Sequence, residues 1–336
     1  MSAVTVPRRL GFSYLFLAAI VLVAVALSLI AGSGDLTDEA LRQPLLRLRA
    51  LRTGAAFVAG ATLAAGGVVV QGLFRNPLAS PSVLGTTAGA ALGGKAALLV
   101  LEAFIARGVA RQVAPEMLLP LGCVAGSLLA LAVLVAVHRQ GDDLVVLLLT
   151  GFLLSALFIA MGGFVTSLAQ ERWELARAMI SFSLGDVSGV GLQRLLLASP
   201  LAFAGIAAAW LWSRPLDLML SGEDEARSLG VDVRQLRFWC VAWTAVLTAA
   251  AVSLGGNVGF VGLIVPHALR PFVGVEHGAL LPACVLAGGG FVVGCDALTR
   301  LLPTQSELPL GVVTGLIGGP VFLMLLVRSR REVLYG

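Results

Sequence analysis

Long runs of apolar, uncharged residues repeat along almost the whole chain. Because about 20 helical residues are needed to cross about 30 Å of hydrocarbon, each run predicts a transmembrane helix. The run 238–266 is too long for one helix, and Gly255-Gly256-Asn257 within it favours a turn, so we expect two helices there. The other runs are 11–34, 53–74, 76–94, 117–137, 144–170, 195–213, 278–295 and 308–327. The pattern predicts an all-α polytopic membrane protein with ten transmembrane helices in a single domain, residues 1–336.

Composition supports this class and excludes others. Only 12% of the residues are charged and 58% are hydrophobic, whereas soluble domains carry about a quarter charged residues. The net charge is +4, but the arginines stand singly between apolar runs and form no basic stripe, which argues against a nucleic-acid partner. The cysteines lie inside apolar runs without paired spacing, as expected for packing residues: Cys123, Cys240, Cys284 and Cys295.

The basic residues near the two termini bear on orientation. Ten helices place both termini on one side, and positive residues favour the cytoplasm. The lysine and arginine residues of alternate loops are nearly balanced, so the loops alone do not decide the orientation. The terminal arginines that predict cytoplasmic termini are Arg8, Arg9, Arg328, Arg330 and Arg331.

The sequence offers no convincing catalytic or metal-binding motif. Residues 89–95 read GxxxxGK, but Ala96 replaces the Ser or Thr that would hold magnesium, and the segment is a predicted membrane helix. The histidines stand far apart, at expected helix ends or loops: His138, His267 and His277. We therefore predict a protein that is not an enzyme and has no metal site.

Glycines recur every fourth residue in two predicted helices. Such stripes let helix backbones approach closely, which favours tight packing within the chain. A subunit interface or a moving gate is the alternative. The stripes are Gly85, Gly89 and Gly93, and Gly311, Gly315 and Gly319.

Few ionisable residues fall inside the predicted spans. Lys95, the only lysine, is expected to snorkel outward or to pair with Glu102, and a role on a transport pathway is the alternative. Asp296 and Arg300 are one helical turn apart and are expected to pair. No well-placed carboxylate occupies mid-membrane, which disfavours a proton-coupled carrier.

The polar segment 215–235 predicts a short helix in a loop. Ser221 is placed to cap it, acidic residues fill its first turn, and Gly230 is placed as its left-handed stop. The helix would present Arg227 and acidic side chains to a partner, or else serve as a solvated connector.

Four segments together resemble the iron-chelate and vitamin B12 uptake permeases of bacterial ATP-binding-cassette importers. Residues 49–85 carry RALRTGAAFVAGATLAAGGVVVQGLFRNPLASPSVLG, and residues 222–233 carry GEDEARSLGVDV. Residues 255–270 carry GGNVGFVGLIVPHALR, and residues 307–326 carry ELPLGVVTGLIGGPVFLMLL. The likeness keeps its order and spacing over almost the entire chain.

The resemblance implies the fold and partners of a type II importer permease. Such permeases are homodimers in the bacterial inner membrane, surrounded by lipid, with two cytoplasmic ATPase subunits and a periplasmic substrate-binding protein. ATP and magnesium would bind the ATPases, and this chain would need no cofactor. The loop 215–235 would then be the ATPase-coupling loop, with its coupling residues at Gly222, Glu223, Asp224, Glu225, Ala226, Arg227 and Gly230.

The resemblance also assigns residues at the two membrane surfaces. A segment before helix two and an arginine ending helix nine would dock the binding protein through Arg49, Arg52 and Arg300. Ala50-Leu51 replaces the family's Leu-Pro between the first two. The cytoplasmic gate would comprise Asn76, Pro77 and Leu78, with Leu144 and Val145 from the less similar segment 141–146.

The resemblance leaves the cargo open. It implies an iron chelate moved by alternating access at the homodimer interface, with haem favoured and a siderophore possible. A vitamin B12 permease of the same family is the alternative. An ion-coupled secondary transporter, which would need no ATPase, is the alternative from another class.

Overall fold

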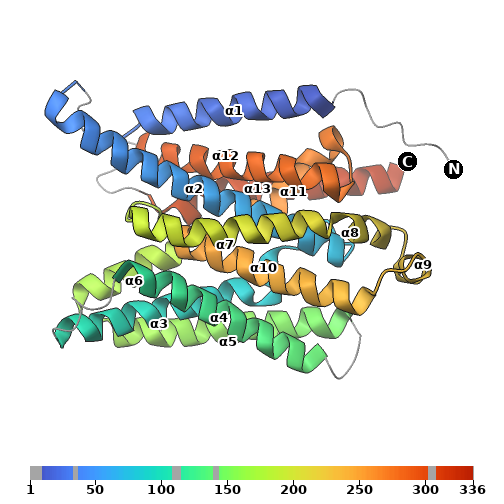
Figure 1. The fold of residues 1–336 in the computed structure, drawn as a ribbon, viewed down its shortest axis with the longest axis horizontal. Coiled ribbons are helices and arrows are strands. Elements are labelled where there is room, and N and C mark those ends of the chain that lie inside the picture. Colours follow the sequence, from blue (N-terminus) through green and yellow to red (C-terminus); the bar gives the residue numbers. More distant parts are fainter. Residues whose placement is uncertain (1–9, 33–36, 108–114, 139–143, 302–307, 336) are drawn as a thin grey trace.

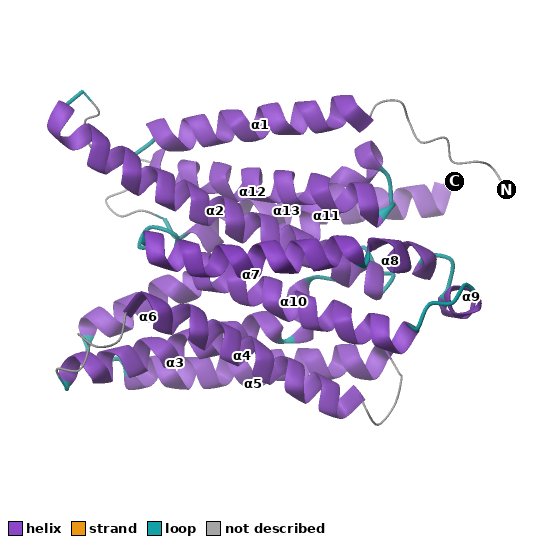
Figure 2. Ribbon diagram, in the orientation of Figure 1, coloured by secondary structure: helices purple, strands orange, loops and turns teal. Residues whose placement is uncertain are grey.

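The computed structural model describes residues 10–32, 37–107, 115–138, 144–301 and 308–335, and these form helices joined by short turns (Figures 1 and 2). The elements are α1 (Leu10–Ile30), α2 (Glu39–Leu73), the 3₁₀ helix η1 (Pro81–Leu84), α3 (Thr86–Ala106), α4 (Pro115–His138), α5 (Leu144–Leu168), α6 (Trp173–Leu184), α7 (Leu192–Leu211), α8 (Ser213–Met219), α9 (Glu223–Ser228), α10 (Val233–Gly255), α11 (Val261–Val273), α12 (His277–Leu301) and α13 (Leu310–Tyr335).

The number of membrane-spanning helices agrees with the sequence pattern. Within the described residues, eight helices are long and apolar enough to cross a membrane: α1, α2, α3, α4, α5, α7, α10 and α12. The shorter apolar helices are α11 and the Leu310–Met324 part of α13, and with them the count reaches ten. The predicted all-α polytopic fold is confirmed.

The predicted division of the run 238–266 is also confirmed. Helix α10 ends at Gly255, and α11 begins at Val261. Gly256 follows α10 with a φ of 64° and lies so close to the carbonyl oxygen of Phe182 that an added Cβ would overlap it. Glycine is therefore required here both by backbone conformation and by space.

Two predicted helix starts are wrong. Helix α2 begins at Glu39 rather than at residue 53. The prediction began too late because it counted only uncharged residues and so left out the first part of the helix, which carries arginines. The helix is capped by Asp38, whose side chain accepts a hydrogen bond from the Ala40 N–H at 2.9 Å. Helix α3 begins at Thr86 rather than at residue 76. The preceding segment contains Pro77 and Pro81, which lack N–H donors, and it forms a turn followed by η1.

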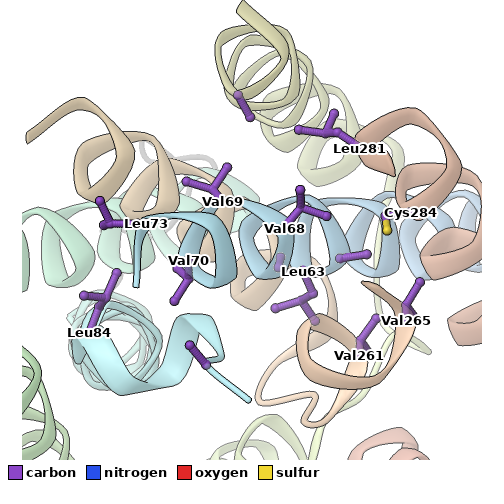
Figure 3. Close-up of a cluster of buried hydrophobic side chains, with 14 of the residues drawn as sticks. Leu63, Val68, Val69, Val70, Leu73, Leu84, Val261, Val265, Leu281 and Cys284 are labelled. Carbon is purple, nitrogen blue, oxygen red and sulfur yellow. The ribbon is translucent and has the colours of Figure 1, made fainter. Parts of the chain in front are cut away.

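Helix α2 lies at the centre of the bundle. Its apolar window is 83% buried, against 11% for that of α1, so α2 is surrounded by protein whereas α1 faces outward. Figure 3 shows the packing around it: Val261 and Val265 of α11 and Leu281 and Cys284 of α12 gather against its apolar side chains. The α2 side chains in this cluster include Leu63, Val68, Val69, Val70 and Leu73.

Glycines let the central helices approach one another. A Cβ added at Gly60 of α2 would overlap the carbonyl oxygen of Gly288 on α12. In the first glycine stripe, Gly89 and Gly93 of α3 pack in the same way against the α4 backbone. This stripe therefore serves close packing within the chain. In the second stripe, Gly319 has open space where its Cβ would lie.

Replacing Gly60 with alanine is expected to lower the free energy of unfolding by about 1–3 kcal/mol, because the Gly288 backbone cannot rotate away as a side chain would. Thermal unfolding in detergent measures the change. Gly294→Ala on α12 is the control, since its Cβ would meet open space. Equal unfolding temperatures for the two variants would contradict the close approach.

The bundle has two distinct ends. Helix α9 lies at the same end as the start of α1 and the end of α13 (Figure 1). An even number of spans places both termini of the chain on one side of the membrane, as this arrangement does. The last turn of α1, the first part of α2 and the last turn of α12 lie at the opposite end. Arg8 and Arg9 lie outside the described residues, as do the side chains of Arg328, Arg330 and Arg331. The cytoplasmic placement of the α9 end stays a prediction.

Candidate functional site

Helix α9 is a short, exposed helix held between two glycines. Gly222 precedes it with a φ of 125°, and Gly230 follows it with a φ of 89°. The Val231 N–H donates to the Ala226 carbonyl and the Gly230 N–H to that of Arg227, both at 3.0 Å, which is a Schellman stop. The predicted stop at Gly230 is confirmed. The predicted cap at Ser221 is wrong, since Gly222 occupies the N-cap position without a side-chain bond.

The side chains of α9 divide into an inner and an outer set. The Glu223 carboxylate accepts a hydrogen bond from the buried Arg237 guanidinium of α10, and Ala226 is fully buried. Asp224, Glu225 and Arg227 are exposed. The structure thus brings all seven predicted coupling residues together, and it divides them into residues that hold the helix and residues that a partner would meet.

A buried histidine ties the loop before α9 to the bundle. The Asp217 carboxylate of α8 accepts the His277 N–H at 2.7 Å and contacts its Nδ1 at 2.6 Å. His277 is the first residue of α12, and its Nε2 lies against Gly72 of α2. Sequence reasoning missed this pair because the two residues are 60 positions apart. The pair therefore joins α8, which precedes α9, to α12 and brings His277 against α2.

The predicted gate segments lie at the α9 end, at the end of α2 and the start of α5 (Figure 1). Asn76 accepts the Leu78 N–H at 2.9 Å, and this turn holds Pro77 and Leu78 at the surface. Leu144 is partly buried, whereas Val145 is 68% exposed. Residues 141–143 of the second predicted segment lie outside the described residues.

The three predicted docking arginines gather at the opposite end. Arg49 and Arg52 lie within α2, so their predicted position before that helix is wrong. Arg49 is 6% exposed and donates to the carbonyl oxygens of Leu29 and Ile30 at 3.0 and 2.8 Å. Arg300 donates to those of Ser28 and Ala31 at 2.8 and 2.9 Å. Both side chains therefore cap the last turn of α1.

One buried carboxylate joins two of these arginines. Asp296 of α12 has no exposed side-chain surface, and its oxygens lie 2.8 Å from Arg52 Nε and 2.9 Å from Arg300 Nη2. The predicted Asp296–Arg300 pair is confirmed. The link to Arg52, across 244 positions, is evident only in the structure. We call Arg49, Arg52, Asp296 and Arg300 the arginine cluster; it fastens α1, α2 and α12 together.

A polar cavity of about 320 Å³ adjoins the arginine cluster. Its walls include Arg52, Arg177 and Asp186. Burial raises the pKa of the Asp186 carboxyl, but hydrogen bonds from Ser181 and the Ser188 N–H outweigh this effect and hold the pKa below its usual value. Asp186 was not predicted, because a lone acidic residue after an apolar helix gives no sequence signal.

Lys95 lies in the middle of α3 and faces α5. Its ammonium donates to the Gly162 carbonyl at 3.2 Å. Glu102, the expected partner, lies instead 3.6 Å from Arg172. Lys95 also lines a cavity of about 310 Å³.

These features define a class before any relative is considered. Eight helices able to span a membrane, two shorter apolar helices, an exposed short helix at one end and an arginine cluster at the other describe, for the described residues, a polytopic membrane protein with a distinct surface at each end. The described residues contain no group of three or more His, Cys, Asp or Glu side chains able to hold a metal ion.

Comparison with known proteins identifies the family. The model of the FecCD transport family matches residues 11–328, so the chain belongs to this family. It is 35% identical over 300 residues to the hemin transport system permease protein HmuU of Yersinia pestis, covering 88% of this chain and 86% of that protein. It is 34% identical to the vitamin B12 import system permease protein BtuC of Klebsiella pneumoniae, covering 96% of each.

A third relative and a solved structure agree with this assignment. The Fe(3+) dicitrate transport system permease protein FecD of Escherichia coli is 34% identical, covering 85% of this chain and 86% of that protein. An inward-facing structure of a metal-chelate type ABC transporter superposes with a TM-score of 0.82 and 28% identity, covering 94% of this chain and 98% of that one. The chain is thus a multi-pass permease subunit of an ABC importer for iron chelates, haem or vitamin B12. It is not an enzyme, and ATP hydrolysis belongs to a separate subunit.

Proposed function

We propose that two copies of this chain form the membrane pathway of an importer that moves an iron chelate, with haem as the favoured cargo. The observation that carries the proposal is the pairing of a family match over residues 11–328 with an exposed, rigidly capped α9. The open space beside Gly319 on α13 fits close approach of a second copy. Lipid would cover the remaining apolar surface.

The mechanism uses both ends of the bundle. In the cytoplasm, one ATPase subunit docks on the α9 helix of each copy. Both termini of the chain lie on this same side. ATP-driven closure brings the two α9 helices together, and Asp217–His277 transmits the motion to α12 and α2. The turn at Asn76 and the start of α5 close the cytoplasmic side.

A periplasmic binding protein delivers the cargo at the opposite end. Its acidic side chains meet the arginine cluster, where Arg52, with 14% of its side chain exposed, is more accessible than Arg300 at 4%. Docking therefore includes competition with Asp296 for the same guanidinium groups.

Uptake by the assembled importer in proteoliposomes tests the proposal. With its ATPase and a loaded binding protein, the complex is expected to accumulate haem only when ATP is present. Cobalamin is the second cargo to supply, because relatives that import vitamin B12 align over 96% of the chain. If the importer accumulated cobalamin and not haem, cobalamin would be the cargo instead of haem. Uptake by the chain without an ATPase, abolished by a protonophore, would establish a secondary transporter instead.

A further inference from the structure

We propose that Lys95 and the cavity it lines bind a carboxylate of the transported cargo, so that the permease selects an anionic chelate. The inference rests on the proposed importer function and names its substrate class. The first observation is the position of Lys95, the tenth of 21 residues in α3, among the spans of the bundle. A charged residue there is retained where it faces a partner or a water-filled path.

The ammonium of Lys95 has no anionic partner within the described part of the chain. Its hydrogen bond goes to the neutral Gly162 carbonyl, and the nearby acidic candidate, Glu102, is paired with Arg172. An ammonium has three donors, so at least two remain for a ligand. The charge therefore lies uncompensated beside a cavity.

The cavity is lined by polar groups from five separate segments. They come from η1, α3, α5 and α6, and from the turn after α10, and the polar members besides Lys95 are Ser82, Thr87, Ser155, Ser183 and Asn257. Ser155 and Ser183 already donate to backbone carbonyls at 3.0 and 2.6 Å, which leaves their oxygens as acceptors. These oxygens can accept hydrogen bonds from water, while the Lys95 ammonium supplies the donors that a carboxylate needs.

Thr87 supplies the second independent sign of a ligand. It is 8% exposed, and its hydroxyl oxygen has no hydrogen-bond partner among the described residues. A buried hydroxyl without a partner is costly unless a ligand or water completes it. Thr87, Ser82 and Asn257 also line a neighbouring cavity of about 300 Å³, so the two cavities are adjacent. The two cavities share these three polar residues, although most of their lining is apolar.

A charge series at Lys95 tests the proposal in the full importer with its ATPase and binding protein. Haem, which carries two carboxylates, is the probe. Lys95→Arg is expected to keep haem uptake within about threefold, Lys95→Met to lower it about tenfold, and Lys95→Glu to lower it further. Glu102→Gln, which removes a charge from the same helix outside the cavity, is expected to change uptake little.

Two further measurements separate a ligand role from a structural one. Basal ATP hydrolysis and the unfolding temperature are expected to stay unchanged in Glu102→Gln. The same two measurements establish that each Lys95 variant is folded and assembled before its uptake is compared. Equilibrium binding of haem to the importer in nanodiscs is expected to weaken in Lys95→Met, whereas binding of haem dimethyl ester is not. Equal losses for Met and Glu, equal losses for haem and its ester, or unchanged haem uptake by Lys95→Met would overturn the inference. Failure of the wild-type importer to take up any iron chelate would overturn the proposed function itself.

Discussion

Replacing Asp296 with alanine is expected to lower the free energy of unfolding by about 3–5 kcal/mol. The carboxylate is wholly buried and compensates two guanidinium groups, those of Arg52 and Arg300. Removing it leaves two like charges in the interior with less than their full set of partners, and it loosens the contact between α2 and α12. The change is measured by unfolding the purified permease in detergent with increasing SDS.

Glu276→Ala serves as the control for this measurement, because Glu276 is exposed just before the other end of α12. Its replacement is expected to change stability by no more than about 0.5 kcal/mol. Asp296→Asn keeps the shape but not the charge, and it is expected to fall between the two. If Asp296→Ala unfolds like Glu276→Ala, the arginine cluster does not hold α1, α2 and α12 together at this end of the bundle.

Reversing the charges of Glu225 and Arg227 is expected to reduce substrate-stimulated ATP hydrolysis and transport by at least tenfold. Both side chains are exposed on α9, so the substitutions change the surface proposed to meet the ATPase without disturbing the bundle. The free energy lost with close charge pairs at a protein interface, about 1.5–7 kcal/mol, is large enough to account for a tenfold reduction. The measurement is ATP hydrolysis by the assembled importer with and without loaded binding protein.

The coupling experiment has its own control in Arg234→Ala, an exposed arginine of α10 outside α9. That variant is expected to hydrolyse ATP and transport at the wild-type rate. The unfolding temperature of the double variant is expected to match the wild type, because Glu223 and Ala226 still hold α9 in place. Normal stimulation of hydrolysis in the double variant would show that the ATPase docks elsewhere.

The sequence predicted the helices of the bundle better than their ends. Apolar length fixes whether a segment can cross a bilayer, so the count of ten and the break near Gly256 followed directly. The start of α2 was missed because Arg49 and Arg52 interrupt an apolar run in the sequence, whereas in the structure both guanidinium groups have hydrogen-bond partners inside the protein. The partners of these arginines lie on α1 and α12, which are other segments of the chain, so counting charges along one run could not reveal them.

The candidate sites divide in the same way. The residues of α9 were predictable because its acidic first turn and its stop at Gly230 are local features, although the predicted cap at Ser221 was wrong. The pairs Asp217–His277 and Arg52–Asp296 were not, because each joins positions far apart in the chain. Lys95 was predicted as an unusual residue, but only the packing of α3 on α5 showed its carbonyl partner and its cavity.

The sequence by itself determined that this protein lies in a membrane, crosses it about ten times and carries a short capped helix between two spans, since hydropathy and capping are local properties. Only the tertiary structure decided which spans are central, which arginines are buried around Asp296 and which side of α9 is free. The physical reason is that long-range pairs depend on how helices pack, and in a bilayer that packing is set by small residues and polar contacts between segments distant in sequence.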